Sequence, residues 1–290
     1  MKQVGKVFLL VLLGLSGVAQ EPPVPRVAIP LIVKGSHHRP INLAVESLVI
    51  SDQKTPVAGA NLLRGADLPL ELGVLIDASN SQRSADLDDI LKATKQFVDA
   101  AISGPEDRVF FLKFEATPQA TGWLKREQLQ GTTLKVGIRG GTALYDALAM
   151  ASKERMGPRD WHKPTRRVLV LVSDGEDNLS HITRDEAASE ALRAGAVIFT
   201  VDTELSGMAY RGVKIMQNLA DVTGGESFSQ VDKKDAPKVF ASIRETMAGM
   251  YYLSYVPPDA LKSALHEVEV KPVPKEKFRL SYPRKYFWNQ

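Results

Sequence analysis

The chain has 290 residues, of which 44% are hydrophobic, and its 37 Lys and Arg residues nearly balance its 34 Asp and Glu residues, for a formal net charge of +3. Such a small net charge predicts no partner, and apart from the last few residues basic and aromatic residues do not interleave as a nucleic-acid platform requires. The chain contains no cysteine, which excludes a disulfide framework and lipidation at a cysteine.

Residues 1–19 have the pattern of a secretory signal peptide. Lys2 and Lys6 precede an apolar stretch from Val7 to Gly17, and Ala19 ends a cleavage site of small residues. The stretch is about eleven residues long, too short to span a bilayer comfortably. We therefore expect an exported protein, periplasmic or secreted, that has no stable membrane span once the leader is removed.

Residues 20–69 are expected to form a β-rich lead-in and not an independent domain. A proline-rich segment at 21–25 is followed by short apolar stretches at 27–33 and 47–50, which are separated by turn-forming residues. Stretches of this length between turns are typical of strands.

Residues 70–250 alternate between strand-like and helix-like patterns. Strands are expected at 72–76, 107–114, 168–172, 197–201 and 227–229, and helices at 87–102, 143–156, 184–193, 213–222 and 236–250. This alternation predicts an α/β fold with a doubly wound, mostly parallel central sheet that is covered by helices on both faces.

After residue 250 the pattern changes to a period of two, in 251–256, 266–271 and 278–282, which predicts antiparallel strands. We expect this C-terminal β-rich extension, residues 251–290, to pair with lead-in strands between residues 27 and 66. Its basic residues are expected to form the solvated face of these strands, and not a patch for an anionic polymer or a lipid headgroup.

Three polar segments lie beside strands of the predicted sheet. Asp77-Ala78-Ser79-Asn80-Ser81 follows the apolar run 72–76, Gly140-Gly141-Thr142 precedes a helical pattern, and Ser173-Asp174-Gly175 follows the strand at 168–172. Ligands of such sheets bind beyond the carboxyl ends of the strands, so Asp77 and Asp174 can share one cation. Their carboxylates, with the hydroxyls, are ligands that Mg²⁺ prefers. The first segment alone is also typical of a helix N-cap, so the predicted metal site depends on all three.

Together the three segments resemble the metal-ion-dependent adhesion site of von Willebrand factor A (VWA) domains. The resemblance covers about residues 70–250 and implies the Rossmann-like VWA fold. Gln82 stands where many family members carry methionine, but this is not a ligand position. The stretch Tyr-Leu-Ser-Tyr-Val-Pro at 252–257 and the later His-x-Val-x-Val at 266–270 are similar to the C-terminal segment of exported bacterial VWFA-related proteins of the acidobacterial type.

The resemblance implies that Ser79 and Ser81 bind the ion directly, and that Asp77, Thr142 and Asp174 bind it directly or through water. Mg²⁺ is the expected ion, with Mn²⁺ or Ca²⁺ as alternatives. With few carboxylates around it the ion stays electrophilic, and an open position then accepts a carboxylate from a protein ligand. The implied function is a divalent-cation-dependent, adhesion-type binding module and not an enzyme. The oligomeric state is not predicted.

Polar residues near the three segments have simpler expected roles. The segment Glu176–Asn178 is expected to be a solvated loop, and Asp202 is expected to cap a helix or turn. Asp146 lies one helical turn beyond Thr142 and is expected to support the loop by hydrogen bonding. The five histidines indicate no metal or catalytic site.

Two alternatives to the adhesion module stay open. A scaffold whose metal only stabilises the fold would use the same ligands, so a chelator-sensitive pulldown is needed to distinguish it. A metal-dependent hydrolase or phosphoryl-transfer enzyme is disfavoured by the motifs. Phosphoryl-transfer families place a second Asp two residues after the first, where this chain has Ser79. The chain also lacks a G-x-S-x-G elbow and the lysine of a P-loop.

Overall fold

The computed structural model describes residues 25–35, 42–82, 87–204, 210–259, 262 and 264–288. The predicted export leader at 1–19 lies outside the described residues, as do the adjacent His37 and His38.

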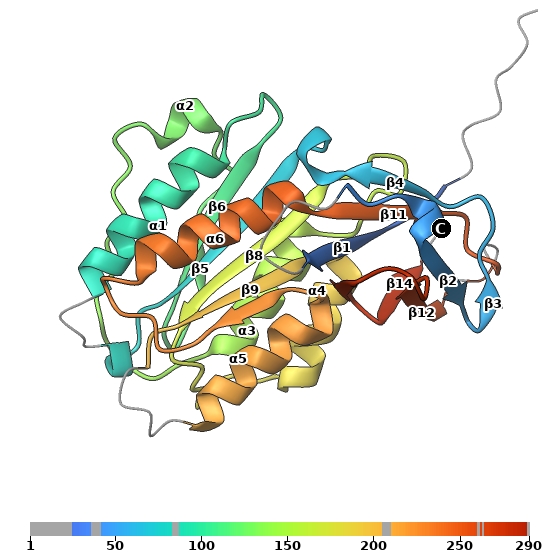
Figure 1. Ribbon diagram of the computed structural model, residues 1–290. Coiled ribbons are helices and arrows are strands. Elements are labelled where there is room, and N and C mark those ends of the chain that lie inside the picture. Colours follow the sequence, from blue (N-terminus) through green and yellow to red (C-terminus); the bar gives the residue numbers. More distant parts are fainter. Residues whose placement is uncertain are drawn as a thin grey trace, which may run out of the picture.

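A six-stranded sheet runs through the centre of the molecule (Figure 1). Its strands are β5 (Leu70–Asp77), β6 (Arg108–Phe114), β7 (Gln119–Ala120), β8 (Arg166–Ser173), β9 (Val197–Asp202) and β10 (Glu226–Phe228). Their order is β10-β9-β8-β5-β6-β7, and β7 runs antiparallel to β6 whereas the other neighbours pair in parallel. The prediction of an α/β fold with a mostly parallel sheet is confirmed.

The central strand β5 is buried along its whole length, which is why its sequence is an almost continuous apolar run. Val74 faces one hydrophobic core and Leu75 faces the other, as the period-two geometry of a strand requires. Gly73 fits because a Cβ there would lie 2.5 Å from side-chain atoms of Leu169 and Phe110 on the neighbouring strands.

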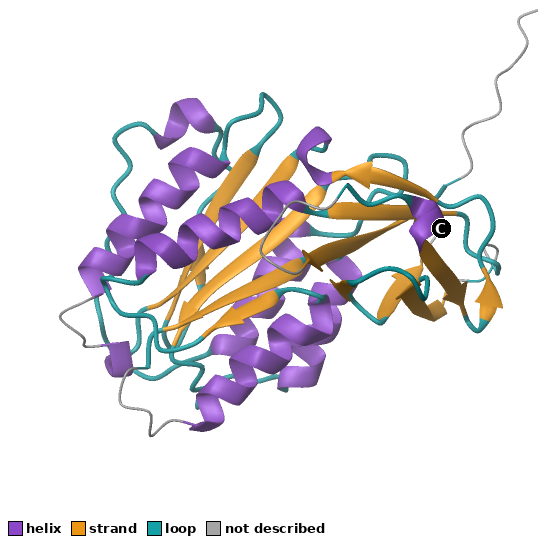
Figure 2. Ribbon diagram, viewed as in Figure 1, coloured by secondary structure: helices purple, strands orange, loops and turns teal. Residues whose placement is uncertain are grey.

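Helices cover both faces of the sheet (Figure 2). They are α1 (Leu87–Ala101), α2 (Arg126–Leu129), α3 (Leu144–Ala149), α4 (Arg184–Ala194), α5 (Tyr210–Thr223) and α6 (Ala236–Gly249), with one-turn helices η1 (Val45–Ser47), η2 (Gly65–Asp67) and η3 (Asn80–Gln82). On one face α1 packs against α6 through stacked Phe97 and Phe240 rings, whose centroids are 5.5 Å apart. The opposite core contains buried residues of α3, α4 and α5.

The helix expected at 143–156 differs from its prediction. It begins as α3 and continues as a π-helical segment, η4 (Met150–Met156). By contrast, α4 follows its sequence signals closely. Thr183 and Glu186 form a capping box at its start, and Gly195 ends it in the left-handed conformation with φ of 66°.

The lead-in and the C-terminal strands form two further sheets at one end of the molecule, on the right of Figure 1. One has the order β13-β1-β11-β4 and the other β14-β12-β2-β3. Their strands are β1 (Val27–Gly35), β2 (Leu48–Asp52), β3 (Thr55–Pro56), β4 (Asn61–Arg64), β11 (Tyr251–Tyr255), β12 (Ala264–Pro272), β13 (Phe278–Ser281) and β14 (Lys285–Trp288). β11 pairs antiparallel with β1 and β4, and β12 with β2, so segments from the two ends of the chain pair as the sequence predicted.

A buried polar cluster joins these two sheets. Asp52 of β2 is fully buried, and its Oδ1 lies 2.9 Å from Nδ1 of buried His266 on β12. Its Oδ2 accepts hydrogen bonds from the hydroxyls of Tyr255 on β11 and Tyr286 on β14. Side chains from four strands therefore contact each other at one carboxylate. The sequence did not indicate that His266 would be part of such a cluster.

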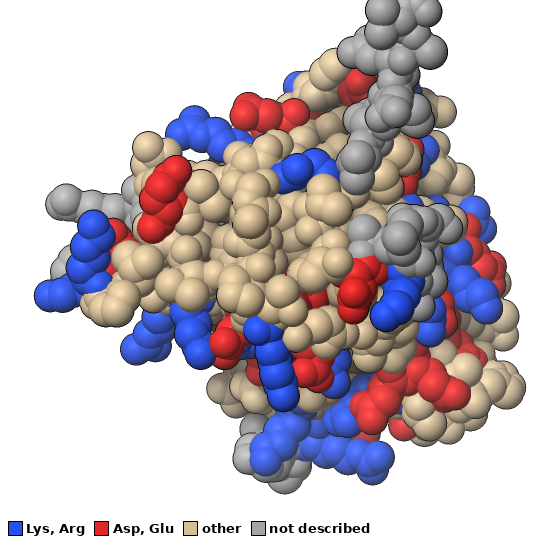
Figure 3. All heavy atoms as spheres, turned by 90° about the vertical axis from the view of Figure 1, so that its right-hand side faces the viewer, with Lys and Arg blue, Asp and Glu red and all other residues tan. Residues whose placement is uncertain are grey.

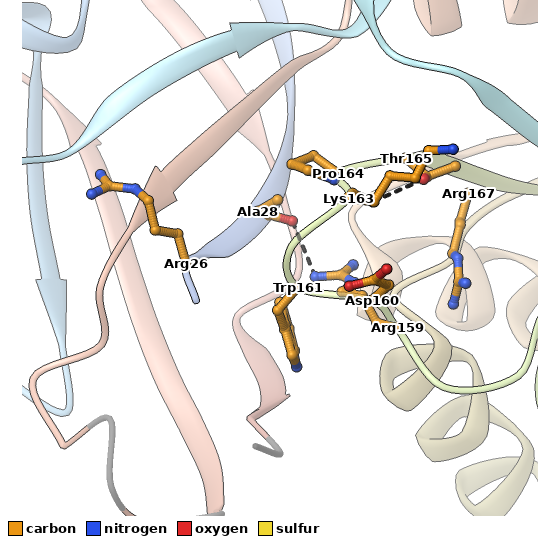
Figure 4. A pocket seen from close by; sticks show the side chains of 9 residues that line it. All are labelled: Arg26, Ala28, Arg159, Asp160, Trp161, Lys163, Pro164, Thr165 and Arg167. Atoms are coloured by element: carbon orange, nitrogen blue, oxygen red, sulfur yellow. Dashed lines mark hydrogen bonds between the residues drawn. The ribbon is translucent and has the colours of Figure 1, made fainter. Parts of the chain in front are cut away.

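An arginine binds the lead-in strand β1 to the amino ends of the parallel strands (Figure 4). Arg159 donates to the carbonyl of Ala28 on β1 at 3.1 Å and to the carbonyl of Gly195 after α4 at 2.9 Å. Arg26 and Arg167 line the same pocket and bond to other carbonyls, Arg26 to those of Gly59 and Ser254 and Arg167 to that of Ala194. The pocket is therefore a structural junction and its cations do not converge on a ligand.

The outer face of the extension carries charges of both signs (Figure 3). Lys271 pairs with Glu269 at 2.7 Å, and Lys285 pairs with Glu267 at 3.3 Å. These pairs agree with the predicted solvated face. Within the described residues, no helix has the length and apolar character needed to cross a membrane.

Candidate metal centre

The first segment of the predicted site leaves the carboxyl end of β5. Asp77 is the last residue of this buried strand and is itself only 1% exposed. Its Oδ1 accepts the backbone N–H of Ser79 at 2.9 Å, and its Oδ2 accepts the hydroxyl of Ser173 at 2.6 Å. The carboxylate is thus held rigidly between the ends of β5 and β8.

The two serines of the first segment lie next to each other. Their hydroxyl oxygens are 2.9 Å apart, with Ser79 buried and Ser81 exposed. Ser81 belongs to the short helix η3, whose Gln82 is buried and accepts the hydroxyl of Thr203 at 2.8 Å. Ser81 therefore marks the side from which the site is open to solvent.

The second segment is fixed to the first by backbone hydrogen bonds. Arg139 donates its N–H to the carbonyl of Ala78 at 2.9 Å, and Asn80 donates to the carbonyl of Gly140 at 3.1 Å. Gly140 has φ of 72°, a conformation that favours glycine. This turn brings buried Thr142 to the same sheet edge as Asp77.

The third segment begins with Asp174, directly after β8, and this residue is 3% exposed. Its Oδ1 accepts the N–H of Glu176 at 3.1 Å. Gly175 has φ of 77° and lies against the start of α5, where a Cβ would lie 2.4 Å from the carbonyl of Gly212. Close packing on α5 therefore fixes the turn that presents Asp174.

The Glu176–Asn178 segment is a loop with Asn178 exposed, as expected, but two of its side chains also make contacts that were not expected. The Oδ1 of Asn178 accepts the N–H of Thr142 at 2.8 Å, and the carbonyl of Thr142 accepts the N–H of Asn178 at 3.0 Å. The Oδ1 of Asp177 accepts the N–H of Leu144 at 2.8 Å, at the start of α3. Both side chains thus hold the second and third segments together.

Asp146 forms hydrogen bonds as expected, but its carboxylate accepts the N–H groups of His181 and Ile182, which lie in the loop before α4 and after the third segment. Ser173 is a contact that the sequence interpretation missed, although it directly precedes Asp174 in the quoted motif. The expected cap role of Asp202 holds for one oxygen only. Its Oδ1 accepts the N–H of Glu204 at 2.9 Å, whereas its Oδ2 is buried without a hydrogen-bond partner in the described part of the chain.

The electrostatics of this sheet edge are dominated by buried negative charge. Burial raises the pKa of Asp77 to about 6, against the hydrogen bonds from Ser173 and Ser79, and the charge of Asp174 raises it further. Burial also raises the pKa of Asp202 to about 6, against hydrogen bonds from the backbone N–H groups of Glu204 and Gln230, and the charge of Asp174 raises it further. Among the described residues no Lys or Arg forms an ion pair with any of these three carboxylates.

The residues present fit a hard divalent cation. Asp77, Asp174 and the hydroxyls of Ser79, Ser81 and Thr142 are all oxygen donors, which suit Mg²⁺ and Mn²⁺. In the described ranges no three His, Asp or Glu side chains converge closely enough to hold an ion. The donor set therefore combines two carboxylates with neutral hydroxyls, and its missing positive charge would come from the ion.

The chain is similar to one known protein family and to several solved structures. The family model described as von Willebrand factor type A domain matches residues 71–241. The pilus adhesin SpaC of Lactobacillus rhamnosus GG is 10% identical, with a TM-score of 0.50, over 81% of this chain and 46% of that chain. The von Willebrand factor type A structure from Catenulispora acidiphila is 11% identical, with a TM-score of 0.47, over 92% and 74% of the two chains. The manganese-loaded TRAP protein of Plasmodium vivax is 11% identical, with a TM-score of 0.44, over 77% and 95%. Such low identities describe the fold alone, and a search of curated proteins finds no match.

Proposed function

The chain belongs to the von Willebrand factor type A domain family, and from that premise we propose that it is an exported module that captures a protein partner through a divalent cation. Ser79 and Ser81 bind the ion directly, and Asp77, Thr142 and Asp174 bind it directly or through water. The ion is Mg²⁺, or Mn²⁺ or Ca²⁺ in its place, and it supplies an open coordination position for a carboxylate of the partner.

The observation that carries the proposal is the unpaired buried charge of Asp77. A carboxylate that is 1% exposed, with a pKa raised to about 6, destabilises the folded chain at neutral pH unless a positive charge neutralises it. Asp174 stands beside it and adds a second negative charge. A bound cation explains why two such groups occupy one sheet edge.

The rim of the site supports access by a partner. Ser81 is exposed, and Leu179 is 44% exposed although it is a large apolar residue. Leu179 donates its N–H to the carbonyl of Thr142 at 3.0 Å, so it stands directly beside the second segment. On the other side Arg139 is 72% exposed while its Nε donates to Glu115 at 3.0 Å. A partner carboxylate on the ion can thus be flanked by apolar and charged contacts.

The wider architecture also supports this function. In the doubly wound arrangement that we propose, strand order reverses at β5, and such reversal points are where open α/β sheets bind ligands. The lead-in strand β1 is tied near the amino ends of the parallel strands, through Arg159, and so leaves the carboxyl ends free. We further propose that residues 1–19 direct export and that the chain belongs to the acidobacterial-type VWFA-related proteins.

Chelator-sensitive capture tests the proposal. Purified protein lacking residues 1–19 is immobilised and exposed to envelope and secreted fractions, in Mg²⁺ or in excess EDTA. Wild type and the exposed-site control Asp259→Asn should retain the same partner in Mg²⁺ and release it in EDTA. Asp77→Asn should retain none in either buffer. Capture that is equal in Mg²⁺ and EDTA, with Mg²⁺ still bound by wild type, would instead favour a scaffold whose metal is only structural.

A further inference from the structure

Asp202 lies in a row with two residues of the metal centre. It ends β9 and is level with Ser173 of β8, which in turn donates to Asp77 at the end of β5. By strand alternation Ser173 and Asp202 face the same core as Leu171 and Ile198, the core that α3, α4 and α5 cover. Asp77 faces that core as well, two residues after Leu75.

The row contains the carboxylates of Asp77 and Asp202, and between them Ser173 has a single hydroxyl proton to donate. Ser173 donates that proton to Asp77 Oδ2 at 2.6 Å and accepts the N–H of Gly175 at 3.0 Å. Asp202 is fully buried, and its Oδ2 makes no close hydrogen bond within the described ranges, although the backbone N–H of Gln230 also faces the carboxylate. A buried acceptor left unsatisfied is costly, and such groups are rare in folded proteins without a bound water or ion.

The position of Asp202 is fixed by contacts to both flanking segments. Its neighbour Thr203 donates its N–H to the carbonyl of Ser173 at 3.1 Å and its hydroxyl to Gln82 at 2.8 Å. Gln82 follows Ser81 in η3. The end of β9 is thus attached to the first and third segments of the site, and the unsatisfied oxygen belongs to the same rigid unit.

The Oδ2 of Asp202 can accept a further hydrogen-bond donor, and positive charge near that donor would offset the neighbouring carboxylates. Asp174 contributes to the raised pKa of Asp202, so its negative charge is near. No three acidic or histidine side chains in the described chain converge closely enough to hold an ion together, so we do not assign Asp202 as a direct ligand. A water molecule polarised by a nearby cation meets both requirements, and Mg²⁺ in proteins usually keeps several waters.

We propose that Asp202 is a positioning residue of the cation site, whose Oδ2 accepts a hydrogen bond from a water bound to the ion. This inference rests on the proposed cation site and adds a sixth residue to it. Groups that orient the ligands of a metal typically change its affinity about 10- to 100-fold when they are replaced.

The test compares Asp202→Asn with wild type in two measurements. Calorimetric titration with Mg²⁺ at neutral pH should give a Kd raised about 10- to 100-fold. Thermal unfolding in EDTA should give a midpoint equal to or above that of wild type, because Asn keeps an oxygen for the Glu204 amide and removes a buried charge. A merely structural role would lower that midpoint. Asp202→Ser keeps an acceptor and should weaken Mg²⁺ binding similarly, and Asp259→Asn should change neither quantity.

The outcomes separate this inference from the proposed function. If wild type binds Mg²⁺ and Asp202→Asn binds it equally well, Asp202 has no part in the site while the cation site itself stands. A lowered midpoint in EDTA for Asp202→Asn, together with unchanged Mg²⁺ affinity for the folded variant, would assign the residue to the fold alone. If wild type binds no Mg²⁺, both the proposed function and this inference are overturned.

Discussion

Replacing Asp77 by Asn should stabilise the metal-free protein, although it removes a residue of the functional site. The substitution keeps the shape of the side chain, so its oxygen can still accept the Ser79 N–H and its amide can donate to the Ser173 hydroxyl. What it removes is a buried carboxylate whose pKa is raised to about 6 from 3.8. The expected gain therefore comes from charge and not from packing.

The size of the gain follows from the pKa difference. Each unit corresponds to about 1.36 kcal/mol, so ionised Asp77 lowers the free energy of unfolding by about 3 kcal/mol at pH 7. Because the pKa of Asp77 is higher in the folded state, this penalty grows as pH rises from about 4 to about 6 and is absent at lower pH. The advantage of Asp77→Asn should shrink to about 0.5 kcal/mol at pH 4.

Urea unfolding of both proteins in EDTA at pH 7 and pH 4 measures the stability advantage of Asp77→Asn. A repeat in saturating Mg²⁺ at pH 7 measures how much the ion stabilises each protein. Wild type should gain about 2.7 kcal/mol at a Mg²⁺ concentration one hundred times its Kd, whereas Asp77→Asn should gain nothing. A variant that is less stable than wild type in EDTA at pH 7 would refute the electrostatic reasoning. So would an advantage that is the same at both pH values.

Three further outcomes are expected. Mg²⁺ affinity should fall as pH drops below about 6, approaching tenfold per pH unit, because a proton on Asp77 competes with the ion. Calorimetry at several pH values checks this, and an affinity that does not change with pH would contradict it. Thr142→Ala should weaken partner binding more than Mg²⁺ binding if the Thr142 hydroxyl binds the ion mainly when the partner is bound. Surface binding and calorimetry on one preparation measure the partner affinity and the Mg²⁺ affinity, and an equal loss of the two affinities would contradict the prediction. Leu179→Ser should weaken partner binding by about 1 kcal/mol, roughly fivefold, because its half-exposed side chain loses apolar burial, while Mg²⁺ affinity stays unchanged; unaltered partner affinity would remove Leu179 from the interface.

Much of the fold was readable from local pattern. The buried strands β5, β8 and β9 are short apolar runs between helical segments, and this alternation alone specifies a parallel α/β sheet. The helix expected at 184–193 matches α4, and the Thr183–Glu186 capping box and Gly195 that bound it depend on only a few neighbouring residues. The segments that meet at the sheet edge were predictable for the same reason, since each adjoins a strand or a helix pattern.

The contacts between segments were not readable in this way. Asn178 and Thr142 exchange hydrogen bonds across 36 residues, and Asp52 meets His266 across 214 residues. Such pairings depend on how strands and loops are placed in three dimensions. The sequence does not distinguish a polar loop residue that forms such a pair from one that is only solvated. The unsatisfied oxygen of Asp202 is of the same kind, because only its burial and surroundings distinguish it from an ordinary turn cap.

The most direct test of the cation site is the anomalous diffraction of crystals soaked in Mn²⁺. The account predicts a single strong Mn²⁺ peak at the sheet edge, within bonding distance of Ser79 and Ser81 and bonded directly or through water to Asp77, Thr142 and Asp174. The peak should vanish in Asp77→Asn crystals soaked in the same way. A fully soaked wild-type crystal with no peak at this edge, or with its only peak elsewhere, would contradict the central claim.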